Sequence, residues 1–238
     1  MPLSEPLRRE HAMRALIILL LLASSVQAAT VTVGPGGSIQ AAIFAAHPGD
    51  WIIVREGKYY EHLQVNKPVT LAGQGMSVLD ATASGSAITL NADGVTVEGF
   101  KIINAGSWPT EKTSEAGIKV LSHDNRIISN DVSNNFNGIL LQGGENNSIF
   151  DNLVSRNLGF GIRLEGSGNN TIYNNSLDEN KQNAFDDGIN HWDKNNYSDF
   201  DVPGEGCIDR GEGLCDRGYV LPGGRSVDEH PRCRTPQE

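Results

Sequence analysis

The sequence is short of the residues that build bulky cores, hold soft metals or attract nucleic acid. Aromatic residues make up only 6% of the 238 residues, and there are three cysteines and three methionines. Acidic residues outnumber basic ones by 29 to 19, so the formal net charge is −10 at pH 7. Binding to a phosphate backbone needs the opposite balance, and we therefore expect no nucleic-acid partner. The hydrophobic content of 38% is ordinary for a folded chain.

The sequence also lacks an apolar run long enough to cross a bilayer. Its longest run, Ala15–Ala23, is well short of the roughly 20 residues that a membrane helix needs. Arginines precede this run and small residues follow it at positions 26–28, as in a secretory signal peptide. We expect residues 1–28 to be a cleaved signal peptide, with translation starting at Met1 or Met13. The mature protein should be extracytoplasmic, in the periplasm or secreted, and should not span a membrane.

Glycine and asparagine are abundant, and they recur in a repeat. Four segments begin with a small residue and continue with apolar residues at alternate positions: Gly117-Ile-Lys-Val, Gly138-Ile-Leu-Leu, Gly161-Ile-Arg-Leu and Ala184-Phe-Asp-Asp. Their spacings are 21, 23 and 23 residues, and periods of this size are typical of solenoids. Two further short strands fit into each unit. The repeat therefore predicts three strands in every turn.

The predicted fold class is all-β, a single-stranded right-handed parallel β-helix that spans residues 29–202. Its inward positions should be apolar, and Phe185 and Asp187 should take the two inward positions of the last unit. Asparagines recur in register at the turns, where stacked amides can bond to one another: Asn130, Asn152 and Asn175, then Asn135, Asn157 and Asn180. A short helix after Ser38 should cap the N-terminal end.

All three cysteines lie in a C-terminal extension, residues 203–238. Cys207 and Cys215 flank a glycine-rich turn, and cysteines can pair in an oxidising compartment. We predict a disulfide between Cys207 and Cys215, with Cys233 left over. A cysteine metal site would normally offer four ligands at closer spacing, so no metal is expected there.

Several motifs between Ser38 and about Pro231 are similar to those of known β-helix proteins. They include Ser38-Ile-Gln-Ala-Ala, His47-Pro-Gly-Asp, Gly57-Lys-Tyr-Tyr-Glu, Lys67-Pro-Val-Thr-Leu, the Asn-Asn-Ser/Thr-Ile repeats and Asn183-Ala-Phe-Asp-Asp-Gly. This stretch resembles the periplasmic copper-binding (NosD-type) β-helix family and the wider group of carbohydrate-binding and sugar-hydrolase β-helix domains. The resemblance implies a pectate-lyase-like solenoid. It says little about activity.

The ligand types that copper or calcium would need are scarce in the mature chain. It has one methionine and five scattered histidines, with no His-x-His or Met-rich cluster, so a specific copper site is not expected. The tail offers Asp209, Glu212 and Asp216 as oxygen ligands, fewer than the six to eight oxygens that calcium usually collects. We expect no resident cofactor, with calcium as the alternative.

A candidate contact surface runs along the outward positions of the first strands. Lys119, Leu140 and Arg163 should line up there, followed by Asp186. Glu165 lies beside Arg163, and Trp108 lies in a polar insertion between the coils. Two cations and an acid around an apolar residue suit a glycan. As site residues we therefore predict Trp108, Lys119, Leu140, Arg163 and Glu165, without assigning any catalytic residue.

The functional expectation is an exported β-helix binding or scaffold module, a monomer whose partner is a carbohydrate or another cell-envelope component. One alternative is a polysaccharide-active enzyme of the lyase or epimerase type. Such an enzyme would need several carboxylates and a base to converge in one groove, and the sequence does not place them together. A second alternative is a periplasmic copper-associated protein.

Overall fold

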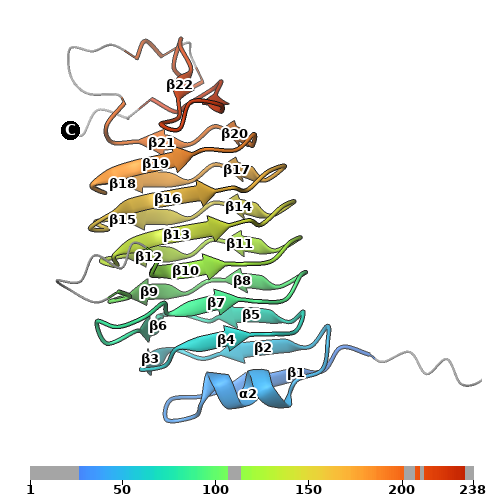
Figure 1. Cartoon of the computed structure of the whole chain (residues 1–238). Helices are drawn as coiled ribbons and strands as arrows, with labels where there is room; N and C mark the ends of the chain where they lie inside the picture. The colour runs from blue at the N-terminus through green and yellow to red at the C-terminus, as the bar shows by residue number, and fades with distance from the viewer. Residues whose placement is uncertain (1–26, 107–113, 201–206, 210–211, 234–238) are drawn as a thin grey trace, which may run out of the picture.

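The structure is a computed structural model that describes residues 27–106, 114–200, 207–209 and 212–233 (Figure 1). Most of the predicted signal peptide, and Trp108 with the centre of its insertion, lie outside these residues. The described chain is a right-handed parallel β-helix, as predicted. Its coils stack from the N-terminal helix at one end to the C-terminal segment at the other (Figure 1).

Three sheets run along the solenoid, and their strands are parallel except for the pair β22 and β23. Sheet A contains β1 (Thr30–Val33), β2 (Trp51–Val54), β5 (Thr70–Gly73), β8 (Thr96–Glu98), β11 (Arg126–Ile128), β14 (Ser148–Phe150), β17 (Thr171–Tyr173), β20 (His191–Asp193), β23 (Val227–Asp228) and β22 (Tyr219–Val220). Sheet B contains β3 (Gly57–Tyr59), β6 (Ser77–Asp80), β9 (Lys101–Ile103), β12 (Asp131–Ser133), β15 (Leu153–Ser155), β18 (Ser176–Asp178) and β21 (Asn196–Tyr197). Sheet C contains β4 (Leu63–Val65), β7 (Ile88–Leu90), β10 (Ala116–Val120), β13 (Asn137–Gln142), β16 (Phe160–Glu165) and β19 (Gln182–Asp186).

The core consists of columns of apolar side chains that point inward from successive coils. In sheet C, Ile118 pairs with Ile139 and Ile139 with Ile162, and all three are fully buried. The glycine at the second position of each of these strands has a steric cause. A Cβ on Gly138 would lie 2.5 Å from the Val154 side chain, so only glycine allows the strand to approach Val154 so closely. The predicted inward register of these strands is confirmed.

Asparagine ladders hold the turns together, as the recurring asparagines predicted. Asn130 Nδ2 donates to Asn152 Oδ1 at 3.1 Å, and Asn152 Nδ2 donates to Asn175 Oδ1 at 2.9 Å. The residue before a ladder asparagine often has a positive φ, as at Asn174 (φ 55°). Asparagine tolerates this left-handed backbone better than most residues, which suits Asn174 to the turn before the ladder residue Asn175.

The helix α2 (Ile39–Ala45) closes the N-terminal end. Ser38 Oγ caps it by accepting from the Ala41 amide at 3.1 Å, and the Glu61 carboxylate accepts from the Ile39 and Gln40 amides at 2.8 and 3.0 Å. The side chains of Ile39 and Ile43 are fully buried beneath it. The predicted capping helix is therefore present.

The last coil departs from the prediction by one residue. Ile162 pairs with Ala184, so Arg163 pairs with Phe185 and Leu164 with Asp186. Phe185 therefore points outward, Asp187 is exposed, and Asp186 is the inward residue. The prediction that Phe185 and Asp187 point inward, with Asp186 outward, was wrong.

Asp186 can occupy this inward position because hydrogen-bond donors surround its carboxylate. Trp192 Nε1 donates to it at 2.8 Å, the Gly188 amide at 2.9 Å and Asn190 Nδ2 at 2.8 Å. A buried carboxylate that would be costly without partners is thus satisfied, and the apolar column stops there.

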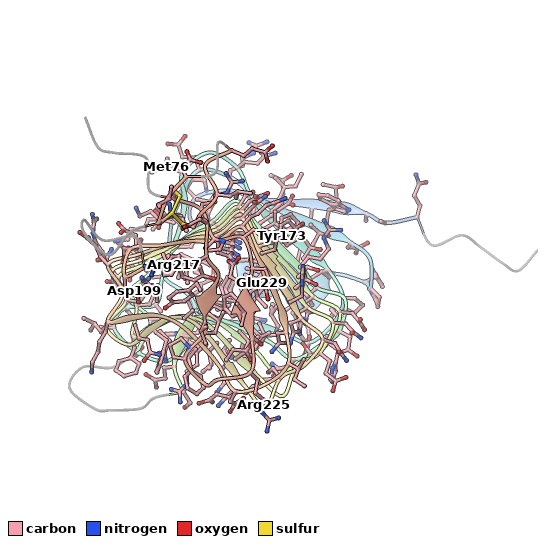
Figure 2. All side chains as sticks on the ribbon, turned by 90° about the horizontal axis from the view of Figure 1, so that it is seen from above. Met76, Tyr173, Asp199, Arg217, Arg225 and Glu229 are labelled. Atoms are coloured by element: carbon pink, nitrogen blue, oxygen red, sulfur yellow. A yellow bond between two sulfur atoms is a disulfide. The ribbon has the colours of Figure 1, made fainter. Side chains whose placement is uncertain are left out.

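Part of the C-terminal extension covers this end of the coils. The strand β23 pairs with β20, and β22 pairs antiparallel with β23 (Figure 2, seen from the C-terminal end). Asp228 on β23 is fully buried and ends the ladder that contains Asn175. Asn175 Nδ2 donates to Asn195 Oδ1 at 2.9 Å, and Asn195 Nδ2 donates to Asp228 Oδ2 at 2.9 Å. Asp228 also accepts from Tyr197 Oη at 3.0 Å. Burial raises the pKa of Asp228 above 3.8 although these hydrogen bonds act in the opposite direction.

Candidate ligand-binding surface

The outer face of sheet C carries one side chain from each coil at the same level of the strand. The backbone register places these side chains in the order Gln64, Thr89, Lys119, Leu140, Arg163 and Phe185. Alternation along each strand turns these residues away from the core. The coil period thus brings residues that are far apart in the sequence onto one surface.

Arg163 is the centre of a cluster on this face. Its guanidinium lies 4.4 Å from the centroid of the Phe160 ring and 5.6 Å from that of Phe185. The two rings meet edge to face, with centroids 5.7 Å apart. Both distances to the guanidinium lie within the range of cation–π attraction. The aromatic rings thus hold the arginine side chain against the sheet.

The polar side of the same cluster is an ion pair extended by an amide. Arg163 Nη2 pairs with Glu165 Oε1, and Gln142 Nε2 donates to Glu165 Oε2 at 2.8 Å. The Arg163 side chain keeps 19% of its surface exposed and that of Glu165 keeps 29%. Arg163 Nε is buried without a hydrogen-bond partner among the described residues. We refer to Phe160, Arg163, Glu165, Phe185 and Gln142 as the arginine–aromatic cluster.

The predicted site residues are only partly brought together. Arg163 and Glu165 are in contact, and Lys119 lies two coils away on the same face, partly exposed. Leu140 points outward between Lys119 and Arg163 but is fully buried, so it cannot contact a ligand directly. Trp108 lies outside the described residues.

Sequence reasoning missed the two phenylalanines. Phe185 was assigned to the interior because the last unit was aligned one residue out of register. Phe160 immediately precedes Gly161, where the repeat was taken to begin. A period of 22 residues aligns Ala184 with Ile162 and therefore Asn183 with Gly161. This alignment places Phe185 opposite Arg163, on the outer face.

A second aromatic group lies on the outer face of sheet A. Phe150 and Tyr173 stack with centroids 4.7 Å apart, and the Arg126 guanidinium lies 5.6 Å from the Phe150 centroid. These rings come from neighbouring coils and are parallel to within 8°. This group serves as an internal comparison for the sheet C surface, because it combines an arginine with two rings but has a different orientation.

The fold defines the class of protein: a right-handed parallel β-helix with a polar and aromatic outer face. The sequence profile of the family described as "Periplasmic copper-binding protein (NosD)" matches residues 67–205, which is more than half of the chain. The chain belongs to this family. The family resemblance of the sequence motifs is thereby confirmed.

Two solved structures and one curated protein are also similar to the chain. A segment of 56 residues is 45% identical to the cell surface glycoprotein of Methanothermus fervidus, and it covers 23% of this chain and 9% of that protein. The crystal structure of pectate lyase Pel9A matches with a TM-score of 0.54 and 16% identity, covering 74% of this chain and 64% of that one. A pectin methylesterase solved with a hexasaccharide matches with a TM-score of 0.43 and 13% identity over 82% and 75%.

The chain matches only part of these related proteins. The chain spans about a tenth of the glycoprotein and less than two thirds of the pectate lyase. The similarity to the lyase concerns the fold alone. The family and the glycoprotein together indicate an extracytoplasmic location. Among the described residues, no helix is long and apolar enough to cross a membrane.

The copper in the family's description can be tested against the described side chains. Within residues 67–205, apart from the two gaps, no three histidine, cysteine, aspartate or glutamate side chains converge. The one converging group in the described chain is Cys207, Cys215 and Cys233, beyond the matched region and within disulfide-bonding reach of one another. The described residues of the matched region therefore do not fit a copper site.

Two of the acidic tail residues considered for calcium accept hydrogen bonds from backbone amides. Asp209 Oδ1 accepts from the Gly213 amide at 2.9 Å, and Asp216 Oδ1 accepts from the Ile208 amide at 3.1 Å. With Glu212 they form no converging group in the part of the chain that the structure describes. Their described role is to shape the turn that carries the cysteines.

Proposed function

We propose that this protein is an extracytoplasmic binding module that holds a carbohydrate chain along the outer face of sheet C. The observation that carries the proposal is the arginine–aromatic cluster, in which half-buried rings and a fixed ion pair lie on one surface. Aromatic faces offer apolar contact area to the C–H face of a sugar ring, and the charged groups offer strong hydrogen bonds to its hydroxyls or carboxylates.

The shape of the surface supports an elongated ligand. Sheet C has six strands, and strands about 4.8 Å apart give a strip about 24 Å long. Lys119 lies two coils from Arg163 on this strip and has no ion-pair partner among the described residues. The unpaired Lys119 and the paired Arg163 lie on different coils, and two separated cations favour a ligand with spaced negative charges, such as a chain of uronic acids.

Binding without turnover is the function that the cluster supports best. Both oxygens of Glu165 are engaged, one by Arg163 and one by Gln142, and Asp187 accepts from the Gly166 amide at 2.7 Å. A general acid or base needs a carboxylate oxygen within hydrogen-bond reach of the substrate, and these oxygens already accept hydrogen bonds within the protein. The carboxylates beside the cluster therefore serve better as hydrogen-bond acceptors than as catalysts.

A glycan array with neutral and uronate oligosaccharides tests the proposal. We expect salt-sensitive binding that Arg163→Ala reduces about tenfold, which corresponds to about 1.4 kcal/mol. Arg126→Ala is the matched control, because Arg126 also lies over a ring but on sheet A. Equal binding by wild type and Arg163→Ala would contradict the assignment of this surface.

A turnover assay separates binding from the lyase alternative. Incubation with polygalacturonate or alginate and calcium should leave ultraviolet absorbance unchanged, because no unsaturated sugar ends form. Product made by the purified wild type and absent from a mock preparation would replace the binding proposal with an enzymatic one. If no glycan binds at all, the cell-envelope scaffold becomes the better description.

A further inference from the structure

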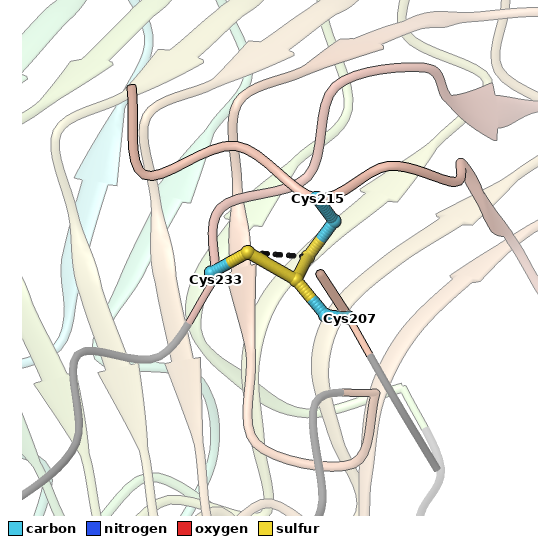
Figure 3. A group of neighbouring side chains, drawn as sticks. All are labelled: Cys207, Cys215 and Cys233. Atoms are coloured by element: carbon cyan, nitrogen blue, oxygen red, sulfur yellow. Dashed lines mark hydrogen bonds between the residues drawn. A yellow bond between two sulfur atoms is a disulfide. The ribbon is translucent and has the colours of Figure 1, made fainter. Parts of the chain in front are cut away.

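The three cysteines of the C-terminal extension meet at one point (Figure 3). Cys207 Sγ lies within bonding reach of both Cys215 Sγ and Cys233 Sγ, and the corresponding Cα–Cα distances are 5.0 and 6.2 Å. Both Cα distances lie in the range that disulfides use. Cys215 Sγ and Cys233 Sγ are 3.2 Å apart. Cys233 therefore lies in contact with Cys207 and Cys215, the two cysteines predicted to pair.

Backbone hydrogen bonds also hold the segments that carry the cysteines together. The Cys215 amide donates to Pro231 O at 2.8 Å, and the Cys233 amide donates to Gly213 O at 2.9 Å. An antiparallel bridge also joins Asp209 to Cys215. The Arg232 amide in turn donates to Asn195 O at 2.9 Å and so ties this segment to the last coil.

A sulfur atom forms only one disulfide, so three converging cysteines leave one thiol beside one bond. The Cys207–Cys215 and Cys207–Cys233 bonds differ in which thiol they leave unpaired. Cys233 is partly exposed, whereas Cys215 is only 4% exposed. If Cys207 bonds Cys215, the remaining thiol is accessible. If Cys207 bonds Cys233, the remaining thiol is buried.

We propose that Cys207 is the centre of an exchangeable disulfide, and that Cys233 is a thiol-modification site presented only when Cys207 is bonded to Cys215. In the exchange the Cys233 thiolate attacks Cys207 Sγ, and the Cys207–Cys233 bond forms as the Cys207–Cys215 bond breaks. Cys215 leaves as a thiolate and takes up the proton that Cys233 lost. The step is redox-neutral and needs no external oxidant.

The co-reactant for the modification is a low-molecular-weight disulfide. The Cys233 thiolate attacks one of its sulfurs, a mixed disulfide forms on Cys233, and the other half leaves as a thiolate. This traps the arrangement in which Cys207 is bonded to Cys215. The cluster lies beyond residues 67–205, so it belongs to this chain's own extension rather than to the part matched by the family profile.

Counting thiols in serine variants tests the convergence of the three cysteines. Unreduced protein is denatured and alkylated with N-ethylmaleimide, and the alkylated cysteines are counted by mass spectrometry. We expect one thiol per chain in the wild type and none in Cys215→Ser, because Cys207 and Cys233 then pair. Two thiols in Cys215→Ser would mean that Cys233 cannot replace Cys215 as the partner of Cys207 and would overturn the proposal. Cys233→Ser is the control, since a fixed Cys207–Cys215 bond also leaves it with none.

Mapping of the wild type tests the exchange without relying on any variant. After alkylation, trypsin cuts at Arg210 and Arg232 and separates the three cysteines into different peptides. We expect both the Cys207–Cys215 and Cys207–Cys233 linkages. Native protein treated with oxidised glutathione should gain one adduct, on Cys233, and should then show only the Cys207–Cys215 linkage. A single linkage before treatment, or no adduct, would overturn the proposal.

Discussion

The two ends of the solenoid are closed by different chemistry. At the N-terminal end, α2 places the apolar side chains of Ile39 and Ile43 over the first coil. At the C-terminal end, the carboxylates of Asp186 and Asp228 are buried. Trp192 Nε1 donates a hydrogen bond to Asp186, and Tyr197 Oη donates one to Asp228. This fold therefore tolerates a buried inward carboxylate where several hydrogen-bond donors converge on it. Without such donors it would break an apolar column.

The largest expected effect comes from placing an acid in the middle of a column. Ile139→Asp should lower the free energy of unfolding by about 4 kcal/mol, because Ile139 lies between Ile118 and Ile162 and no donor replaces water. Ile139→Val, the matched control, should cost only about 1 kcal/mol. Urea denaturation measures both. Equal stability of the two variants would mean that the inward register is misplaced.

The converse experiment removes the buried carboxylate of Asp228 from the C-terminal end of the solenoid. Asp228→Ala should lower the free energy of unfolding by about 3 kcal/mol, because it leaves the Asn195 amide and the Tyr197 hydroxyl buried without acceptors. Asp228→Asn keeps one oxygen acceptor and should cost less. Denaturant unfolding followed by tyrosine and tryptophan fluorescence reports on this end. An Ala variant as stable as the wild type would show that the carboxylate does not close the solenoid.

The N-terminal end should be less sensitive to the loss of one polar group. Ser38→Ala removes the acceptor for the Ala41 amide and should cost about 1 kcal/mol. Ser38→Thr retains the hydroxyl and should restore most of this. The buried Ile39 and Ile43 remain in both variants. A loss from Ser38→Ala as large as that from Asp228→Ala would erase the contrast between the ends.

Acid should weaken the coil around Asp80 but not the C-terminal end around Asp228, and this is the smallest of the four effects. Burial would raise the pKa of Asp80, but hydrogen bonds from Lys58, Asn104 and the Thr82 amide outweigh it and lower the pKa below 3.8. Its contribution to stability is therefore present above pH 3.8 and is lost as the pH falls through the folded-state pKa. The pKa of Asp228 is raised by burial, so its contribution is complete below pH 3.8 and is lost as the pH rises through its folded-state value.

Hydrogen exchange by peptide fragment measures this difference. Between pH 5 and pH 3, protection factors corrected for intrinsic rates should fall roughly a few-fold in β3 and β6 and should hold in β20 and β23. Asp80→Asn should remove the acid response of β6. A parallel loss at both ends would contradict the assigned pKa directions.

The repeat made most of the fold predictable, because each coil imposes the same requirements on its residues. Glycine was needed where β13 approaches Val154, and asparagine where a ladder amide donates to the next coil. The register of the last coil was not predictable from the repeat, since Asn183 takes the position that Gly161 holds one coil earlier. Trp192 and Asn190 occupy repeat positions, but the repeat does not specify that their side chains donate to Asp186.

The candidate site was predictable only in its backbone positions. The period aligned Lys119 with Arg163 on one face and placed Glu165 near the latter. The contact of Arg163 with Phe160 and Phe185 depends on side-chain conformation, which the period does not specify. The convergence of the cysteines depends on a non-repeating segment that folds back onto the last coil.

The central functional claim is that the outer face of sheet C, and not that of sheet A, holds the ligand. Calorimetric titration with the oligosaccharide that binds best on the array tests it most directly. Phe185→Ala should weaken binding about fivefold to tenfold, because it removes a ring from the arginine–aromatic cluster. Phe150→Ala, which removes a ring of the sheet A group, should leave the affinity unchanged. A loss of affinity in Phe150→Ala with Phe185→Ala unaffected would contradict the account.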